Sequence, residues 1–517
     1  MRWNAHRPIM AGAIAAAAAV ALTACTSSPG GGKADPADLA TIDMMAPVIT
    51  AQAPSATGDM QKAVEQLTGK KLNMTWVPNS SYNDKTNITL ASGSMPEVMV
   101  IQGKIPAFVQ NAKAGAFWDL TDRIDKYPNL AKANKQVRLG ASIDGHLYGL
   151  PRERQLMRVA VTIRKDWLAK LGLPEPATVQ DLYAVAKAFT ENDPDGNGKK
   201  DTYGILFPKW PSGYASGSPY DVIETWFGAP NAWGARDGKL VPGFDTTQFA
   251  DGARYIRRLF DEKLVNPDFA TLDSGKPWED AFTNGKGGII IDTSSRTLSI
   301  LSSLKQKDAA NYGKYVTAVG NLLGPDGVRH SLPTFGYSGF LAVSKQSVPT
   351  EAELNDLLAV LDKLASKEGQ ILLNNGIEGR NFTLDNGAAK PVTSTDPAIV
   401  TLKNDLGAFG QIGTLGNDFY QPVPAGQPEK EILDKRAVFH ARDLETAVYN
   451  PAAAFVAPTY TQQGAQLDLI VGDAQVKYFA GQLDESGLKK ETGRWHSEGG
   501  DKVVTEMNDL YAKAGGK

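Results

Sequence analysis

The chain has 517 residues, of which 42% are hydrophobic and 21% are charged. Its 54 Lys and Arg are balanced by 57 Asp and Glu, giving a formal net charge of −3. This balance provides no basic surface of the kind that nucleic-acid-binding proteins use, so we expect no nucleic-acid partner. The length is large for one compact core and predicts two or more domains.

Residues 1–24 have the features of a secretory signal peptide. A short basic segment precedes an apolar run over 8–24, which is shorter than the about 20 residues that span a bilayer. The run ends in Leu22-Thr23-Ala24-Cys25, which resembles the lipobox of bacterial lipoproteins. An ordinary signal peptide that ends near a cysteine is the alternative. Cys25 is the only cysteine of the chain, so it has no internal disulfide partner, and acylation would account for it.

Residues 25–39 form the expected tether. The segment is rich in Ser, Gly and Pro and carries no apolar face, which is typical of a flexible linker. With Cys25 acylated, the tether would hold the protein on the extracytoplasmic face of the cell membrane. We therefore expect a lipid-anchored, extracellular protein.

Strand-like and helical patterns alternate through the rest of the chain, which favours an α/β fold. In chain order the sequence predicts a strand over 41–50, a helix over 59–67, a strand over 72–77, a helix over 83–92, strands over 97–101 and 159–163, a helix from Thr178, a helix over 278–284, strands over 287–292 and 339–343, a helix over 351–366, and mostly helical segments over 434–483 and 500–514.

Two local signals refine this pattern. Residues 143–151 read as a hairpin with Asp144 and Gly145 in the turn. Thr178 with Asp181 three positions later is a variant of the capping box that begins helices. Apolar residues at helical spacing follow on one face of that helix.

Five stretches, in this order, resemble extracellular solute-binding proteins of ATP-driven carbohydrate importers, with the alginate-oligosaccharide and lipoprotein-type binders as the nearest branch. They are Tyr148-Gly149-Leu150-Pro151, 163–168 with 171–173, 193–204, 278–282 with 285–288, and 376–379 with 382–384. The resemblance implies an α/β fold of the periplasmic-binding-protein-like type II, with two lobes, a hinge and an interlobe cleft. It also implies a sugar ligand, importer permease subunits as partners, and a monomer.

In that fold the lobes are discontinuous in sequence. We expect the first lobe at 40–158 plus 332–395 and the second at 159–331 plus 396–517. The segment 158–163 would be one hinge crossing. The residues alone support only a two-domain α/β protein.

Residues 193–204 resemble the calcium-binding loop of an EF-hand. Asp193, Asp195, Asn197 and Asp201 fall at positions one, three, five and nine, and Lys199 would offer its backbone carbonyl at position seven. Position twelve is glycine in place of the bidentate glutamate, and position ten is Thr202, where the similar alginate binders have an acid. A polar loop after a helix is the alternative. We predict a structural Ca²⁺.

A sugar ligand needs aromatic rings for its C–H faces and polar groups for its hydroxyls. The carboxyl ends of strands are where open α/β sheets bind ligands, so we take candidates from predicted strand ends and loops. The aromatic candidates are Trp210, Trp226, Trp278, Phe335, Tyr337 and Tyr420, and the polar candidates are Gln102, Lys104, Glu153, Asp292, Arg296 and Arg380.

Motifs for catalysis are scarce. The chain contains no phosphate-binding Gly-x-x-x-x-Gly-Lys-Ser/Thr loop, no Gly-x-Ser-x-Gly elbow and no His/Cys cluster with zinc spacing. We therefore expect a binding protein and not an enzyme. A binder of peptides or another solute, and a secreted glycan-cleaving enzyme, are the alternatives.

Overall fold

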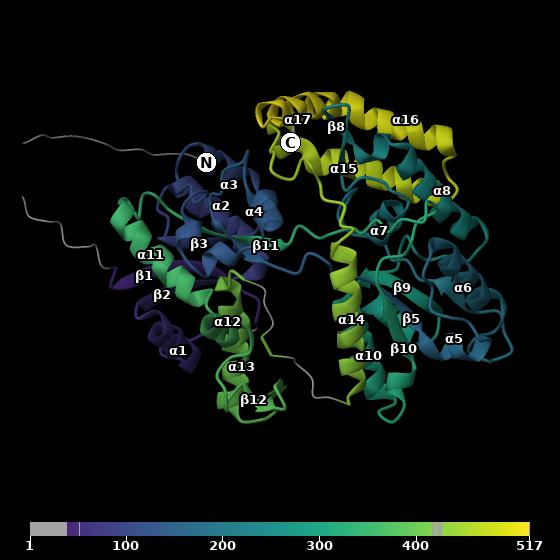
Figure 1. The fold of residues 1–517 in the computed structure, drawn as a ribbon, viewed down its shortest axis with the longest axis horizontal. Helices are drawn as coiled ribbons and strands as arrows, with labels where there is room; N and C mark the ends of the chain where they lie inside the picture. The colour runs from purple at the N-terminus through teal and green to yellow at the C-terminus, as the bar shows by residue number, and fades with distance from the viewer. Residues whose placement is uncertain (1–38, 51, 416–418, 421–425, 516–517) are drawn as a thin grey trace, which may run out of the picture. The chain divides into compact units, whose positions relative to one another are not determined.

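The computed structural model describes residues 39–50, 52–415, 419–420 and 426–515 (Figure 1). The predicted signal peptide, Cys25 and all but the last residue of the predicted tether lie outside the described residues. None of the described helices is both long and apolar enough to cross a bilayer.

The first of two main sheets has five strands in the order β2-β1-β3-β11-β4. Strand β1 pairs in parallel with β2 and β3, whereas β11 pairs antiparallel with β3 and β4. A strand from late in the chain is thus inserted between two early ones. The strands are β1 (Thr41–Val48), β2 (Lys71–Pro78), β3 (Val98–Ile101), β4 (Leu150–Glu153) and β11 (Tyr337–Val343).

Seven helices accompany this sheet and share an apolar core with it. They are α1 (Asp59–Thr68), α2 (Tyr82–Ser92), α3 (Pro106–Lys113), α4 (Lys135–Ala141), α11 (Glu351–Leu364), α12 (Lys367–Asn374) and α13 (Pro397–Phe409). The core includes Leu402 and Phe409 of α13. We expected residues from 396 onward in the second lobe, but α13 packs in the core of the first sheet.

The second sheet has four strands in the order β10-β5-β9-β6. Strand β5 pairs antiparallel with both β10 and β9, and β6 pairs in parallel with β9. The strands are β5 (Val159–Arg164), β6 (Tyr203–Ile205), β9 (Gly287–Thr293) and β10 (Val316–Val319). Residues 289–291 are three consecutive Ile with no exposed surface, as expected of a strand buried on both faces.

The remaining helices gather around the second sheet. Helix α15 contacts both α16 and α17, and Figure 1 shows it beneath these two helices. The helices are α5 (Lys165–Leu171), α6 (Val179–Glu191), α7 (Pro219–Trp226), α8 (Thr247–Asp261), α9 (Lys276–Thr283), α10 (Ser294–Lys307), α14 (Pro428–Leu444), α15 (Pro458–Phe479), α16 (Glu485–Trp495) and α17 (Asp501–Lys513). Two hairpins complete the fold, β7 (Trp233–Arg236) with β8 (Lys239–Pro242) and β12 (Phe382–Asp385) with β13 (Ala388–Pro391).

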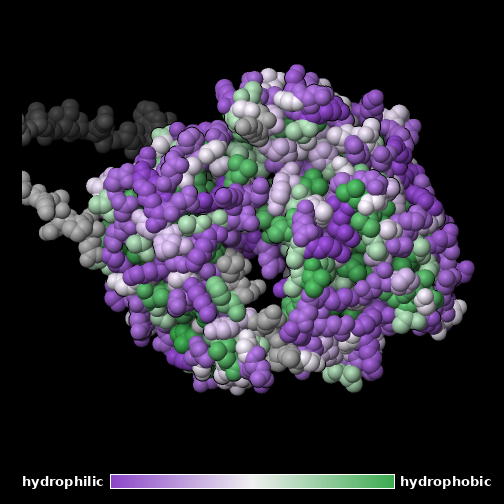
Figure 2. All heavy atoms as spheres, in the orientation of Figure 1, coloured by the Kyte–Doolittle hydropathy of each residue, from purple (hydrophilic) through white to green (hydrophobic). Residues whose placement is uncertain are grey.

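The described surface is mostly hydrophilic on the face drawn in Figure 2, where apolar residues form scattered groups. The large apolar side chains lie inside instead, in separate clusters around the two sheets. The largest two of these clusters surround one sheet each.

The local signals of the sequence are present in the structure. Thr178 accepts a hydrogen bond from the backbone N–H of Asp181 at 3.0 Å, and the Asp181 carboxylate accepts one from the N–H of Thr178 at 3.0 Å, so the capping box of α6 is complete. At the predicted hairpin, Asp144 and Gly145 have φ of 52° and 90° in a tight turn. The hairpin consists only of the bridge between Ile143 and His146, because β4 pairs with β11 instead.

Two connecting segments run side by side between the sheets. The N–H of Arg154 donates to the carbonyl of Gly336 at 2.7 Å, and the N–H of Thr334 donates to the carbonyl of Leu156 at 2.8 Å. We expected a crossing over 158–163, but Val159 already pairs in the second sheet. The connection is therefore 154–158.

Gly288 offers a direct test of how tightly the second core is packed. A Cβ at this position would lie 2.2 Å from the Phe189 ring and 2.8 Å from that of Trp167, and these two rings are themselves in edge contact at 5.2 Å. Gly288→Ala should therefore lower the free energy of unfolding by about 1–3 kcal/mol, as overpacking does.

Gly493 in α16 is the matched control, since a Cβ there would meet nothing within 4 Å. Gly493→Ala should leave stability unchanged or raise it by up to about 1 kcal/mol. Chemical denaturation of both variants measures this, and equal stability of the two would contradict the packing described here.

Candidate functional site

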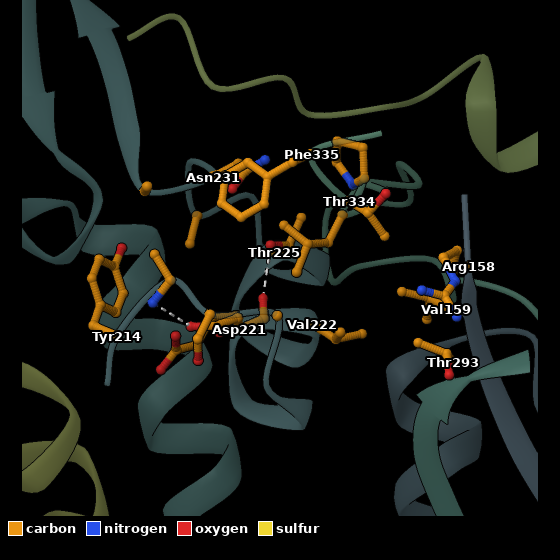
Figure 3. Close-up of a pocket in the computed structure, with 18 of the residues that line it drawn as sticks. Arg158, Val159, Tyr214, Asp221, Val222, Thr225, Asn231, Thr293, Thr334 and Phe335 are labelled. Atoms are coloured by element: carbon orange, nitrogen blue, oxygen red, sulfur yellow. Dashed lines mark hydrogen bonds between the residues drawn. The ribbon is translucent and has the colours of Figure 1, made fainter. Parts of the chain in front are cut away.

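A cavity of about 250 Å³ lies where strands of the second sheet end (Figure 3). Val159 pairs with Thr293 because β5 and β9 are antiparallel, so the start of β5 meets the end of β9. The backbone N–H of Ser294 donates to the carbonyl of Arg158 at 2.7 Å and holds the two ends together. This edge supplies one wall of the cavity.

The other walls come from the start of α7, the loop before β7 and the connection that leads to β11. Figure 3 shows Tyr214 and Asp221 at one end of the cavity and Arg158 and Thr293 at the other. The further lining residues include Trp210, Ser216, Gly217, Val222, Glu224, Thr225, Asn231, Asp292, Leu332, Thr334 and Phe335.

Two aromatic residues of the lining can present a ring to a ligand. The indole N–H of Trp210 donates to the hydroxyl of Ser216 at 2.9 Å, which fixes the orientation of the ring. Phe335 is 64% exposed, a large fraction for an apolar side chain of this size. Both were candidates from sequence, and the structure brings them to the same cavity.

Two buried carboxyl groups belong to the lining. Asp221 completes a second capping box by accepting hydrogen bonds from the N–H groups of Ser218 at 2.8 Å and Ala215 at 3.2 Å. Glu224, one turn later in α7, is 2% exposed and accepts a hydrogen bond from the Gln475 amide at 2.8 Å. Burial raises the pKa of Glu224 well above its usual range, and the negative charge of Asp221 adds to this effect. Burial also raises the pKa of Asp221.

Asp292 lines the cavity at the end of β9, as its position in the sequence suggested. Its carboxylate pairs with the guanidinium of Arg296 at 2.5 Å. Arg296 also donates to the carbonyl of Ser274 at 2.8 Å and lies over the ring of Trp278, 4.8 Å from its centroid. Arg296 thus neutralises Asp292, and its guanidinium is already engaged within the protein.

Glu153 lines a different cavity, of about 350 Å³, which also includes Arg154, Arg436 and His440. The Glu153 carboxylate accepts a hydrogen bond from the N–H of Asn134 at 2.6 Å, and burial raises its pKa. Burial lowers the pKa of His440 to about 4, so its imidazole is neutral near pH 7.

The structure places two predicted ligand-binding tryptophans in the core. Trp226 and Trp278 have no exposed surface, and their indole N–H groups donate to the side chain of Asn321 and to the carbonyl of Leu206. A buried indole with a satisfied N–H is a stable core residue. The sequence could not separate these residues from Trp210, because all three lie near predicted loops.

The other predicted residues also lie away from the first cavity and have partners within the protein. Gln102 donates to Asn79, Lys104 to the carbonyl of Ala453, Tyr337 to the carbonyl of Gly140, Arg380 pairs with Asp59, and Tyr420 contacts the ring of Phe382. Burial lowers the pKa of Lys104 to about 7.

Several lining residues were absent from the sequence prediction, among them Tyr214, Asp221, Thr225 and Asn231. One signal could have revealed their neighbourhood. Ser218 followed by Pro219 and Asp221 is the pattern of a helix start, with proline in the first turn and an acid at the third position. The loops on either side of it carry no pattern of their own.

The predicted calcium loop gathers its oxygen atoms around Asn197. The Asn197 amide nitrogen donates to Asp195 at 2.8 Å and to Asp201 at 3.0 Å, and Asp193 accepts from the N–H groups of Gly196 and Gly198. Among the described residues, no group of three or more His, Cys, Asp or Glu side chains is arranged to hold a metal ion.

Position twelve of that loop is glycine for a structural reason. A Cβ on Gly204 would lie 2.3 Å from the carbonyl oxygen of Ala186 in α6. A glutamate therefore cannot occupy this position without moving the helix. Thr202 donates to the carbonyl of Phe189 at 2.8 Å, so position ten serves the same close packing.

Comparison with known proteins identifies the family. The model of the bacterial extracellular solute-binding proteins matches residues 53–371. Lipoprotein LipO of Bacillus subtilis is 42% identical over 476 residues, which cover 91% of this chain and 92% of LipO. The chain belongs to the bacterial extracellular solute-binding protein family.

Two other relatives of this solute-binding protein have informative names. The polygalacturonan/rhamnogalacturonan-binding protein YtcQ of Bacillus subtilis is 32% identical and covers 93% of both chains. The structure of the Streptococcus pneumoniae substrate-binding protein FusA in complex with kestose has a TM-score of 0.64 at 19% identity, and covers 92% of this chain and 99% of FusA. A structure of a FusA EF-hand mutant has a TM-score of 0.62.

These likenesses confirm the expected fold. The solute-binding protein has the mixed α/β architecture of the periplasmic-binding-protein-like type II, with the two sheets described above. The family consists of binding proteins, which agrees with the scarcity of catalytic motifs in the sequence.

Helix α15 contacts the part of the cavity lining that contains Tyr214. The carbonyl of Asp468 accepts a hydrogen bond from the N–H of Tyr214 at 3.1 Å, and its carboxyl group accepts one from the Tyr460 hydroxyl at 2.5 Å. Burial raises the pKa of Asp468 to about 6.

This raised pKa predicts a pH dependence of stability. The folded protein holds the Asp468 proton more tightly than the unfolded chain does, so the stabilising contribution is complete below about pH 4 and is lost as the pH rises through about 6. Asp468→Asn should therefore raise the free energy of unfolding at pH 7.5, by at most about 3 kcal/mol, and change it less at pH 4.

Asp473→Asn on the exposed side of α15 is the matched control and should show no such difference between the two pH values. Thermal melting of both variants at pH 4 and 7.5 measures the effect. A destabilised Asp468→Asn variant at pH 7.5 would contradict it.

Proposed function

We propose that this solute-binding protein captures an oligosaccharide outside the cell and delivers it to the permease of an ATP-binding-cassette importer. The observation that carries the proposal is the cavity at the strand ends of the second sheet, where Trp210 and Phe335 accompany hydroxyl, amide and carboxyl groups. Aromatic rings suit the C–H faces of a sugar, and the polar groups suit its hydroxyls. The names of YtcQ and FusA support a carbohydrate ligand.

The two sheets would be the cores of the two lobes. We propose lobes close to the predicted boundaries, 40–158 plus 332–395 and 159–331 plus 396–517, with α13 transferred to the first lobe. The paired connections 154–158 and 332–336 would act as hinge, since they run side by side between the two sheets and are hydrogen-bonded to each other. A ligand favours closure only if it binds the closed state more tightly.

We propose binding without catalysis and a monomeric protein. The cavity lining does contain the carboxyl groups of Asp221, Glu224 and Asp292, and a glycosidase uses a pair of such groups. However, Asp292 is paired with Arg296. Asp221 is engaged with the backbone at the start of α7, and Glu224 is hydrogen-bonded to Gln475. The peptide-binding alternative is tested by the same ligand screen as the sugar proposal, with oligopeptides included.

Trp210→Ala should weaken binding of the cognate oligosaccharide about 10–100-fold, because truncation of an aromatic contact commonly costs a few kcal/mol. Phe335→Ala should weaken it in the same direction. The ligand is first found by a thermal-shift screen of oligosaccharides, and affinities are then measured by calorimetry.

Phe419→Ala is the matched control, since Phe419 is a 41% exposed aromatic residue outside the cavity lining. Unchanged affinity in both cavity variants would contradict the site. Release of shorter sugars from the bound oligosaccharide would favour the enzyme alternative.

We also propose that the loop 193–204 binds a structural Ca²⁺ through Asp193, Asp195, Asn197, Asp201 and the carbonyl of Lys199. Asp195 and Asp201 already accept hydrogen bonds from the Asn197 amide, which would present its oxygen in place of its nitrogen when the ion binds. Calcium prefers such hard oxygen ligands. One of the similar structures is that of an EF-hand mutant of FusA, so this relative has an EF-hand.

Chelation of calcium should lower the melting temperature, because a ligand that binds only the folded state stabilises it, by about 2.7 kcal/mol at a hundredfold excess over its Kd. Asp193→Ala combined with Asp195→Ala should abolish this sensitivity. Metal analysis of the purified protein accompanies the melting curves, and a metal-free protein with an unchanged melting curve after calcium addition would contradict the site.

Finally, we propose that Cys25 is acylated, for example with palmitate, and anchors the mature protein to the membrane. LipO, the relative at 42% identity, is named a lipoprotein. Cys25→Ser should release the protein into the medium or leave the signal uncleaved. Cell fractionation decides this, and a processed variant that stays in the membrane would contradict the anchor.

A further inference from the structure

The charges of the cavity lining are unevenly distributed. Asp221, Glu224 and Asp292 line the cavity, whereas Arg158 is the one Lys or Arg side chain among the described residues of the lining. Asp292 is neutralised by Arg296, so it contributes little net charge. Arg158 lies at the end of the cavity opposite Asp221 (Figure 3). The end formed by α7 is therefore acidic.

The carboxyl groups of this acidic end have no cationic partner. Within the described part of the chain, neither Asp221 nor Glu224 forms an ion pair with a Lys or Arg. Their hydrogen bonds come from backbone N–H groups and from the amide of Gln475. Burial favours the uncharged form of Glu224, so the negative charge of this end is that of Asp221, which backbone N–H groups stabilise as a carboxylate. Asp221 is buried, so solvent screens its charge poorly.

On the basis of the proposed function, we infer that this cavity selects uncharged oligosaccharides and rejects those built from uronic acids. Two unit charges of the same sign about 4 Å apart repel by about 1 kcal/mol in water and about 4 kcal/mol near a protein surface. A sugar hydroxyl, in contrast, can donate a charge-assisted hydrogen bond to Asp221.

Arg158 does not remove this preference. An oligomer of uronic acid carries a carboxylate on every residue, and a single guanidinium at one end of the cavity pairs with one of them. A sugar unit at the acidic end would still place its carboxylate beside that of Asp221. This chain would then differ from YtcQ, whose name includes polygalacturonan, a polymer of a uronic acid.

The test compares neutral trisaccharides with trisaccharides of uronic acids. Calorimetry on the full mature chain would use neutral trimers of galactose, mannose, glucose and fructose, together with trimers of galacturonate and mannuronate. The matched pair is α-1,4-linked galactotriose and trigalacturonate. We expect at least one neutral trimer to bind, at least tenfold more tightly than every uronate trimer. A uronate trimer that binds as tightly as the best neutral one overturns the inference and leaves the proposed function intact.

If no trimer of either class binds and none raises the melting temperature, the proposed function fails as well. The two failures are therefore distinguishable.

The origin of the selectivity is tested by changing single charges. Asp221→Asn should lower the ratio of neutral to uronate affinity about tenfold, whereas Asp473→Asn, which removes an exposed carboxylate of α15, should leave the ratio unchanged. Asn231→Lys adds a cation to the lining without disturbing the cap of α7, and should raise uronate affinity even if Asp221→Asn folds poorly. An unchanged ratio in both cavity variants overturns the electrostatic explanation.

Discussion

The antiparallel pairing of β5 with β9 is the constraint on which the rest of the site depends. It joins residues more than a hundred positions apart in register, with Val159 opposite Thr293, and so brings the start of one strand to the end of the other. Strand β6 is parallel to β9, so its carboxyl end lies at the same edge. The loop that follows β6 leads from this edge to Trp210. A slip of one residue would turn every side chain of β5 to the other face and dismantle this wall.

The same pairing explains why stability and function compete at this edge. The start of α7 is buried against the second core, and Asp221 and Glu224 are buried with it. A buried carboxyl group without a cationic partner costs stability, as the raised pKa of both groups shows. Backbone N–H groups and Gln475 offset part of that cost. Under the proposed function, a cavity lined in this way suits hydroxyl donors, and the unfavourable burial would give the site its chemical preference.

Sequence reasoning succeeded where a pattern is local. Strands β1, β2, β3, β5, β9 and β11, the capping box of α6 and the Asp144-Gly145 turn follow from periodicity and turn chemistry within a few residues, whereas the short strands β6 and β10 do not. It failed where tertiary contacts decide. Trp226 and Trp278 resemble Trp210 in sequence context, but only the fold shows which ring is covered. Helix α13 is amphipathic in any setting, and nothing in its sequence tells which of two cores it joins.

Gly204 is a second example in which tertiary contacts explain a residue that the sequence could not. Gly204 stood out in the sequence as a missing calcium ligand, whereas the structure explains it by the close approach of β6 to α6. The departure from the EF-hand pattern at position twelve thus results from close packing of β6 against α6. Chain order and spacing alone could not distinguish that cause from the loss of a metal site.

A crystal structure of the protein with a bound neutral oligosaccharide tests the central claim most directly. The account predicts sugar density against Trp210 and Phe335, with a hydroxyl within hydrogen-bonding distance of Asp221 and the β5–β9 edge beneath it. Sugar density in the second cavity instead, against Glu153 and His440, with the first cavity filled only by water, would contradict it.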